Sequence, residues 1–261
     1  MKCSRRTMLK LTLLAAAGIA RRQPLLAALA AVVPSEVLKP GAALKAGRWA
    51  MVIDLRKCLE SKDCRDACAR ACHMEHNVPN IANPQHEVKW IWRERGAHLF
   101  PEQLDEFSGA ALADQPIPAL CNHCANPPCT RVCPTGATFK RTDGIVVMDP
   151  HRCIGCRFCM AACPYGSRSF NWEDPRPSLK TVNPEYPTRG KGVVEKCSFC
   201  DERLAQGRLP ACVEACPRGA MAFGDLRDEQ SPVVKLLREN YSIRRMPELG
   251  TQPAVYYLVS K

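Results

Sequence analysis

The sequence predicts a loop-rich α+β fold made of two small units, one inserted in the other. Three observations support this prediction. Sixteen of the seventeen cysteines fall into four runs, short apolar segments precede two of these runs, and 22 prolines among 261 residues favour loops over long helices. Only 6% of the residues are aromatic. Small units of this kind need metal sites or disulfides for their stability besides an apolar core, and the cysteines are the candidates for either.

The chain begins with a segment that is typical of an export signal. It has the twin-arginine form at Arg5 and Arg6, and an apolar run over residues 11–20 follows. We interpret residues 1–30 as a Tat signal peptide, with Ala-Leu-Ala at residues 28–30 as the best cleavage site. The mature protein is therefore expected on the periplasmic, extracytoplasmic face of the cytoplasmic membrane.

The same segment bears on membrane insertion and on metal loading. Neither the first apolar run nor a second one over residues 24–33 reaches the ~18 residues that a spanning helix needs, so no membrane span is expected. The Tat pathway exports folded proteins, so metal centres can be assembled in the reducing cytoplasm first. Cys3 lies inside the signal and has no expected role in the mature protein.

The third cysteine run carries the most specific motif of the chain. Cys153, Cys156, Cys159 and Cys163 form a C-x2-C-x2-C-x3-C pattern, which Pro164 closes. This is the bacterial ferredoxin pattern for a [4Fe–4S] cluster, in which three cysteines bind one cluster and the fourth binds its neighbour. A second run is therefore expected to take part in the exchange.

Applied to all four runs, this exchange rule groups the sixteen cysteines into four sites. They are site A (Cys121, Cys124, Cys129, Cys163), site B (Cys133, Cys153, Cys156, Cys159), site C (Cys72, Cys197, Cys200, Cys212) and site D (Cys58, Cys64, Cys68, Cys216). Site D is irregular, because the first run has C-x5-C-x3-C-x3-C spacing and ends without a proline. We expect four [4Fe–4S] clusters, or three if site D is empty.

Two other uses of the cysteines remain open. Disulfides are common in exported cysteine-rich proteins, but the members of a C-x2-C pair lie too close along the chain to bridge each other comfortably. Zinc accepts four cysteines, and the fourth run alone could bind it. Neither use explains the recurring triplet with a fourth cysteine and a proline, so iron–sulfur clusters are favoured.

The formal net charge of +11 does not indicate a nucleic-acid partner. Six basic residues precede residue 31 and leave with the predicted signal peptide, which reduces the charge to +5. Each oxidised cluster with its four thiolates carries about −2, so four clusters contribute about −8. The mature, loaded protein is then near neutral or slightly acidic.

Short strands are expected beside the cysteine runs. Residues 50–54 and 220–224 precede the first run and follow the fourth run. An Asp-Gly pair predicts a hairpin within residues 138–148, and alternating apolar residues predict a strand over residues 86–93. Prolines and glycines after the runs predict that the chain turns sharply away from each site and enters the next strand. We call these turns the sharp exits. Residues 180–191 are expected to form a surface loop.

These elements suggest the domain organisation. Runs two and three form a contiguous ferredoxin-like dicluster unit over residues 118–180. Runs one and four form a split unit over residues 48–117 and 181–225, into which the first is inserted. Residues 226–261 are expected to form a helix that begins after the N-cap Ser231 and a tail that is extended from Gly250 onward.

Histidines near the cysteines are assigned supporting roles. His73, His76 and His123 lie next to expected ligands, but no run lacks a cysteine, so a role around the sites is favoured over iron binding. Trp90 and Trp92 are expected in the core or in a subunit contact.

Three aromatic residues, Phe158, Tyr165 and Phe199, are expected to shield the clusters from water. No nucleophile elbow, P-loop or dinucleotide fingerprint occurs in the sequence. We therefore assign no catalytic residue and do not expect the chain to be an enzyme by itself.

The four-run layout resembles the iron–sulfur electron-transfer subunits of molybdopterin oxidoreductases, the NrfC/PsrB/DmsB group. The stretches that carry the resemblance begin at Cys121 (CNHCANPPC), Cys153 (CIGCRFCMAACPYG) and Glu195 (EKCSFCD). Within this group, the twin-arginine signal and the stretches ACHMEHNVP, KWIW and DPRP are most similar to the DsrO-type subunits of DsrMKJOP complexes in sulfur-metabolising microbes.

The resemblance implies two neighbours, a quinone-interacting integral membrane subunit of the NrfD type and a multihaem cytochrome c. The chain would relay electrons between them in sulfur or sulfite metabolism. An equivalent subunit of a molybdopterin enzyme, such as a polysulfide or tetrathionate reductase, is the alternative. A zinc-stapled structural or binding module is a more remote one.

Overall fold

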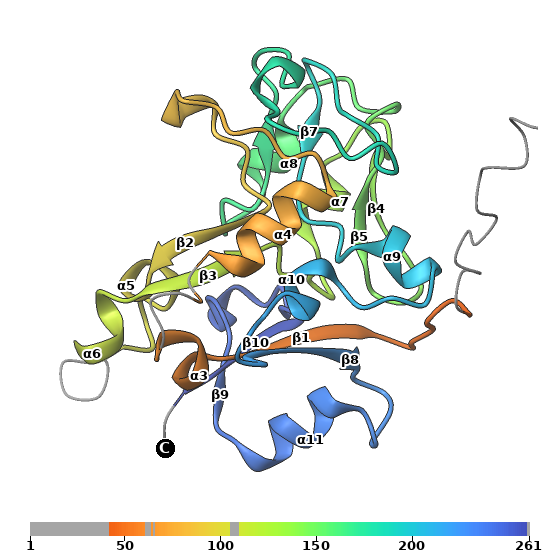
Figure 1. Cartoon of the computed structure of the whole chain (residues 1–261). Helices are drawn as coiled ribbons and strands as arrows, with labels where there is room; N and C mark the ends of the chain where they lie inside the picture. Colours follow the sequence, from red (N-terminus) through yellow and green to blue (C-terminus); the bar gives the residue numbers. More distant parts are fainter. Residues whose placement is uncertain (1–41, 61–63, 65, 105–109, 260–261) are drawn as a thin grey trace, which may run out of the picture. The chain divides into compact units, whose positions relative to one another are not determined.

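The computed structural model describes residues 42–60, 64, 66–104 and 110–259. The predicted signal peptide and Cys3 lie outside these residues. The described residues belong to one unit that begins at Gly41. This unit is mixed α/β and rich in loops, with short helices around small sheets (Figure 1).

The largest sheet joins segments from both ends of the described chain (Figure 1). Its strands, in spatial order, are β8 (Met221–Asp225), β1 (Trp49–Asp54), β10 (Val255–Leu258) and β9 (Ser242–Ile243). β1 pairs antiparallel with β8 and parallel with β10, and every one of its residues is buried. The strands predicted beside the first and fourth runs are confirmed to within one residue.

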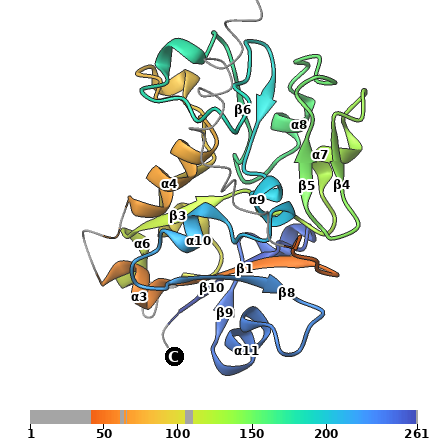
Figure 2. The same cartoon turned by 45° about the vertical axis from the view of Figure 1, so that its right-hand side comes forward.

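The C-terminal tail is extended, as predicted, and its strand β10 is an inner strand of this sheet. Helix α11 (Pro232–Glu239) packs on β8 and β1, on the opposite side of the sheet from α10 (Figure 2). It begins at the predicted proline. Ser231 precedes it, but its side chain makes no capping hydrogen bond, and the buried hydroxyl has no partner in the described residues. The prediction that the Ser231 side chain caps this helix is therefore wrong.

In the part of the chain that the structure describes, the other strands form three two-stranded sheets. They are β2 (Ile91–Arg95) with β3 (Pro116–Leu120), β4 (Thr138–Lys140) with β5 (Val146–Met148), and β6 (Ser169–Phe170) with β7 (Val194–Glu195). The hairpin β4–β5 confirms the prediction, and Gly144 turns it with a φ of 85°. The strand predicted over residues 86–93 begins later, because the chain first makes a 3₁₀ turn.

The helices are short because prolines and glycines end the cysteine runs. Gly136, Gly166 and Gly219 each follow the fourth cysteine of a run and adopt φ values of 63°, 62° and 57°, which L-residues rarely adopt. The predicted sharp exits are therefore confirmed. Among the described residues, the helices besides α11 are α3 (Leu55–Leu59), α4 (Ala67–Glu75), α5 (Gly96–Leu99), α6 (Ala110–Ala113), α7 (Pro128–Arg131), α8 (Phe158–Ala161), α9 (Asp201–Ala205) and α10 (Ala211–Glu214), with 3₁₀ turns η1 (Pro84–His86), η2 (Arg176–Ser178) and η3 (Pro247–Leu249).

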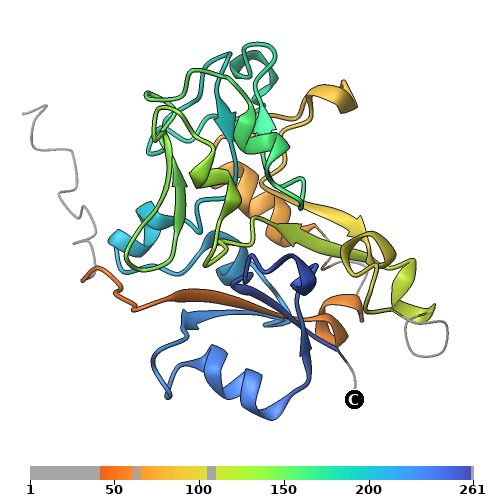
Figure 3. The same ribbon diagram turned by 180° about the vertical axis from the view of Figure 1, so that it is seen from behind.

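Cysteines are part of the apolar core. The main cluster of buried residues contains Trp90 and residues of β1, β2, β3 and β10. It also contains four cysteines: Cys68, Cys72, Cys197 and Cys212. A smaller cluster holds Cys129 and Cys159, where α7 packs on α8 and on the hairpin (Figure 3). Trp90 lies in the core as predicted, whereas Trp92 is half-buried. No helix among the described residues is long and apolar enough to cross a membrane.

Candidate iron–sulfur sites

Short helices bring two cysteine runs to each site. In every run, the fourth cysteine follows the third by four residues. Helix α4 contains such a pair, Cys68 and Cys72. Residues four apart lie on the same helix face, about 6 Å apart along the axis. The third cysteine can therefore reach one site while the fourth reaches the next.

The four cysteines of site D meet in the structure. Burial raises the pKa of the Cys64 thiol, and the thiols of Cys216 and Cys58 raise it further. Burial also raises the pKa of the Cys68 thiol to about 11, with contributions from the same two neighbours. The irregular spacing of the first run therefore does not keep its cysteines away from the fourth run.

Site C is the most deeply buried group. Burial raises the pKa of the Cys72 thiol well above its ordinary value, and the thiols of Cys197, Cys200 and Cys212 act in the same direction. All four are buried. Cys72 comes from α4 and the other three come from the fourth run, so site C, like site D, joins segments more than a hundred residues apart.

Sites A and B each line a cavity. The four cysteines of site A line one of these cavities, together with Tyr165 and Arg168. Those of site B line the other, together with Ile154 and Arg157. Three cysteines of site B are only half-buried, so this site lies nearer to the surface than site C.

The donor set fits [4Fe–4S] clusters. All sixteen described cysteines are free thiols, which gives the disulfide alternative no support. Several buried thiols that raise one another's pKa are unfavourable as thiolates unless positive charge accompanies them, and cluster iron supplies such charge. Four soft sulfur donors per site also match the ligand preference of iron–sulfur clusters.

Backbone donors already point at several sulfurs. The N–H of Gly155 lies 3.4 Å from Cys153 Sγ, and the N–H of Ala220 lies 3.2 Å from Cys216 Sγ. Hydrogen bonds of this kind stabilise negative charge on ligand sulfurs and raise cluster potentials.

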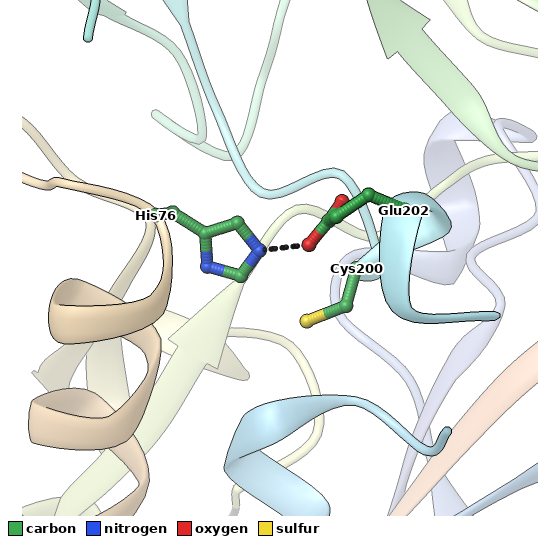
Figure 4. Close-up of side chains that lie close together, drawn as sticks. All are labelled: His76, Cys200 and Glu202. Atoms are coloured by element: carbon green, nitrogen blue, oxygen red, sulfur yellow. Dashed lines mark hydrogen bonds and ion pairs between the residues drawn. The ribbon is translucent and has the colours of Figure 1, made fainter. Parts of the chain in front are cut away.

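His76 lies beside site C, in the supporting role predicted for it. Its Nδ1 is 2.9 Å from the carbonyl oxygen of Cys72, and its Nε2 is 2.7 Å from Glu202 Oε1. Figure 4 shows Cys200 next to this pair, and the ligand atoms of the three residues lie within 4.8 Å of one another. Cys200 is also one of the four cysteines grouped in site C, so His76 and Glu202 lie directly beside that site. Glu202 had no signal in the sequence beyond its position two residues after Cys200.

The predictions for the other residues around the sites are confirmed in part. His123 is buried, accepts a hydrogen bond from the N–H of Val146 at 3.1 Å and stacks on Phe199 at 3.7 Å, so it shapes the site as predicted. Tyr165 and Phe199 are buried beside sites A and C. Phe158 is 60% exposed, so the prediction that it shields a cluster is wrong: the first turn of α8 directs it to solvent.

Sequence reasoning missed the cations beside the sulfurs. Arg168 donates from Nη2 to Cys129 Sγ at 3.0 Å. Lys196 is buried and donates to the carbonyl oxygen of Cys197 at 2.6 Å. Arg93 approaches site D, with Nη1 3.8 Å from Cys58 Sγ. Only Lys196 has a local signal, because it directly precedes a cysteine.

Free cysteines grouped by fours in a loop-rich α/β unit define an iron–sulfur protein of the electron-transfer class. Residues 114–178 and 182–226 match the family described as a 4Fe-4S dicluster domain. The chain is 43% identical to Hdr-like menaquinol oxidoreductase iron-sulfur subunit 1 of Archaeoglobus fulgidus, over 97% of both chains. It is 38% identical to the menaquinone reductase iron-sulfur cluster-binding subunit of Nitratidesulfovibrio vulgaris, over 81% of this chain and 88% of that one.

A third relative is a tetrathionate reductase subunit of Salmonella typhimurium, which is 37% identical over 81% of this chain and 72% of that protein. The chain belongs to this family of [4Fe–4S] electron-transfer subunits, and it carries multiple [4Fe–4S] clusters. The family match thus favours clusters over the zinc alternative.

Proposed function

We propose that the chain binds four [4Fe–4S] clusters, at sites A to D, and relays single electrons between two partners. One partner is a quinone-interacting membrane subunit of the NrfD type, and the other is a multihaem cytochrome c. The complex is of the DsrMKJOP type and serves sulfur or sulfite metabolism. The similarity to a menaquinol oxidoreductase subunit over 97% of both chains supports this assignment.

The closeness of the sites is the observation that carries the proposal. Site D adjoins site C, because Cys68 and Cys72 lie one turn apart on α4. Site C adjoins site A, because Cys121 packs against the core cluster that holds Cys197. Site A adjoins site B, because Cys129 and Cys159 lie in one smaller cluster of buried residues. Sites that adjoin one another in this way support a relay of single electrons.

The chain's own residues prepare the sites for this role. Bound [4Fe–4S] clusters supply one-electron chemistry, with potentials that depend on charge, hydrogen bonds and exposure. The short helices fix the sulfur positions, and Tyr165 and Phe199 exclude water. Backbone N–H groups and buried cations face the sulfurs, which favours the more negatively charged, reduced state.

We also propose the arrangement and location of the protein. Residues 118–180 form the inserted dicluster unit, and β1 and β8, which pair directly, join the two parts of the split unit around it. Residues 1–30 act as a Tat signal, so the complex lies on the periplasmic face of the membrane, held there by its partners. The twin-arginine motif supports this location.

Metal analysis of the complex isolated from native membranes tests the proposal. We expect about sixteen irons for this chain after the haem iron of the partner cytochrome is subtracted, with a matching amount of acid-labile sulfide, and menaquinol should reduce the clusters and so give rise to their EPR signals. Replacement of Cys64 by serine should remove about four irons, because Cys64 lies against Cys216 in site D. A colourless chain with zinc and no sulfide would contradict the proposal.

The similarity to a tetrathionate reductase subunit favours a second assignment. In that case, the chain delivers electrons to a large molybdopterin-binding subunit. The proteins that copurify with the chain discriminate the two assignments. A molybdopterin subunit supports the second, and a membrane quinone subunit with a multihaem cytochrome c and no molybdopterin subunit supports the first.

A further inference from the structure

Arg168 is a buried cation between two sites. It is 5% exposed and follows the turn that ends the third run, just before β6. Its Nη2 donates to Cys129 Sγ at 3.0 Å and to Thr138 Oγ1 at 2.7 Å. The guanidinium therefore lies against a site A sulfur and is held from the other side by the hairpin.

The partners of Arg168 differ from those of two other buried arginines, Arg189 and Arg203. Arg189 lies 2.6 Å from a carboxylate oxygen of Glu195, and Arg203 pairs with Glu75 at 3.0 Å. The hydrogen bonds of Arg168 among the described residues go to sulfur and hydroxyl groups instead. A buried cation is costly without a compensating negative charge, so the ligand sulfurs are its natural counter-charge.

Those sulfurs belong to both sites. Cys129 of site A and Cys159 of site B lie in one cluster of buried residues, and Met148 packs against it. Arg168 Nη1 lies 3.8 Å from Met148 Sδ, and Met148 lines site B. The guanidinium that contacts a site A sulfur therefore also reaches the wall of site B.

We infer that Arg168 is a shared electrostatic partner of sites A and B, and that its fixed charge raises the reduction potentials of both clusters together. Addition of an electron makes a cluster more negative, and a nearby cation in a poorly screened interior favours that state. One side chain thus shifts the potentials of two neighbouring steps of the relay in the same direction. This inference rests on the proposed function, because it requires clusters at both sites.

Arg93 provides a matched comparison inside the same chain. It approaches a single site, with Nη1 3.8 Å from Cys58 Sγ and 3.4 Å from the carbonyl oxygen of Pro116. A charge at this position should act on the site D cluster and leave sites A and B unchanged.

Redox titration followed by EPR tests the inference in the full complex. In Arg168→Gln, we expect two of the four potentials to fall, each by a tenfold or larger change in the reduction equilibrium, or about 59 mV for one electron. In Arg168→Lys, which keeps the charge, both potentials should stay within that margin of wild type. In Arg93→Gln, a third potential should fall while these two stay in place.

Iron and sulfide content separate the possible failures. Wild-type protein without clusters would contradict the proposed function itself. Full iron in Arg168→Gln with unchanged potentials, or with only one potential lowered, would overturn the shared role of Arg168. If Arg168→Gln binds fewer irons, the Arg168→Lys variant tests the role of the charge. Potentials near wild type at both sites in Arg168→Lys support that role, and a tenfold fall in the reduction equilibrium at either site rejects it.

Discussion

Glu195 shows at the residue scale how the region around the sites is held. This buried carboxylate accepts hydrogen bonds from Trp90 Nε1 at 2.8 Å, from Asn171 Nδ2 at 2.7 Å and from Arg189. It lies two residues before Cys197, so it ties the fourth run to segments from other parts of the chain. Since the charge of Arg189 is buried with it, each group depends on the other.

Replacement of Glu195 by glutamine should destabilise the loaded protein strongly. The change leaves the Arg189 charge buried and unpaired, which typically costs about 3–5 kcal/mol in free energy of unfolding. Thermal unfolding followed by circular dichroism measures the effect. Glu173→Gln is the control, because its pair with His86 is largely exposed and should contribute about 1 kcal/mol or less. Equal losses in the two variants would contradict this account.

At the scale of elements, turns matter as much as helices. The helices around the sites are short, and the turns before and after each helix set the path of the chain. In the loop of site B, Gly155 has a φ of 71°, and its N–H points at Cys153 Sγ. A Cβ at this position would lie 2.5 Å from the carbonyl oxygen of Gly192. The loop therefore needs glycine both for its conformation and for close packing.

Replacement of Gly155 by alanine should disturb site B. A left-handed conformation costs an L-residue roughly 1–2 kcal/mol, and here a backbone clash adds to it. We expect a loss of about four irons per chain, measured with acid-labile sulfide. Gly190→Ala should keep all irons, because a Cβ there meets nothing within 4 Å. Full iron content in Gly155→Ala would show that the loop can rearrange.

At the scale of the whole molecule, cysteines of the sites are built into the apolar core. The largest sheet covers one side of the main core cluster, and four cysteines of sites C and D lie in that cluster. Strands from opposite ends of the described chain close the sheet. The fold and the sites are therefore expected to form together, since neither part of the core is complete without the other.

Removal of iron should unfold much of the protein. Metal binding that depends on the folded chain contributes to its folding free energy, and four thiols in the core cannot pack as a cluster does. The clusters are first oxidised and their iron is removed with a chelator, and a reductant then keeps the thiols from forming disulfides. This treatment should abolish the near-UV circular dichroism of the protein and increase its proteolysis. Apoprotein with the same melting temperature as the loaded protein would refute the expectation.

Local patterns explain what could be predicted from the sequence. The hairpin β4–β5, the strands β1 and β8 and the sharp exits after the runs depend on neighbouring residues, so turn chemistry and periodicity predicted them. The cysteine groups followed from ligand spacing, and the structure brings the same groups together. Phe158 shows the limit of such patterns, because its exposure depends on the direction of the first turn of α8.

By itself, the sequence determined the cysteine spacing, the ligand chemistry and the short elements between the runs, because these depend on covalent neighbours and on residues within a few turns. Only the tertiary structure decided that site C adjoins site A, that β10 is an inner strand and that Arg168 contacts a site sulfur. These features depend on contacts between distant segments, whose energies come from burial and charge in an environment that exists only after folding.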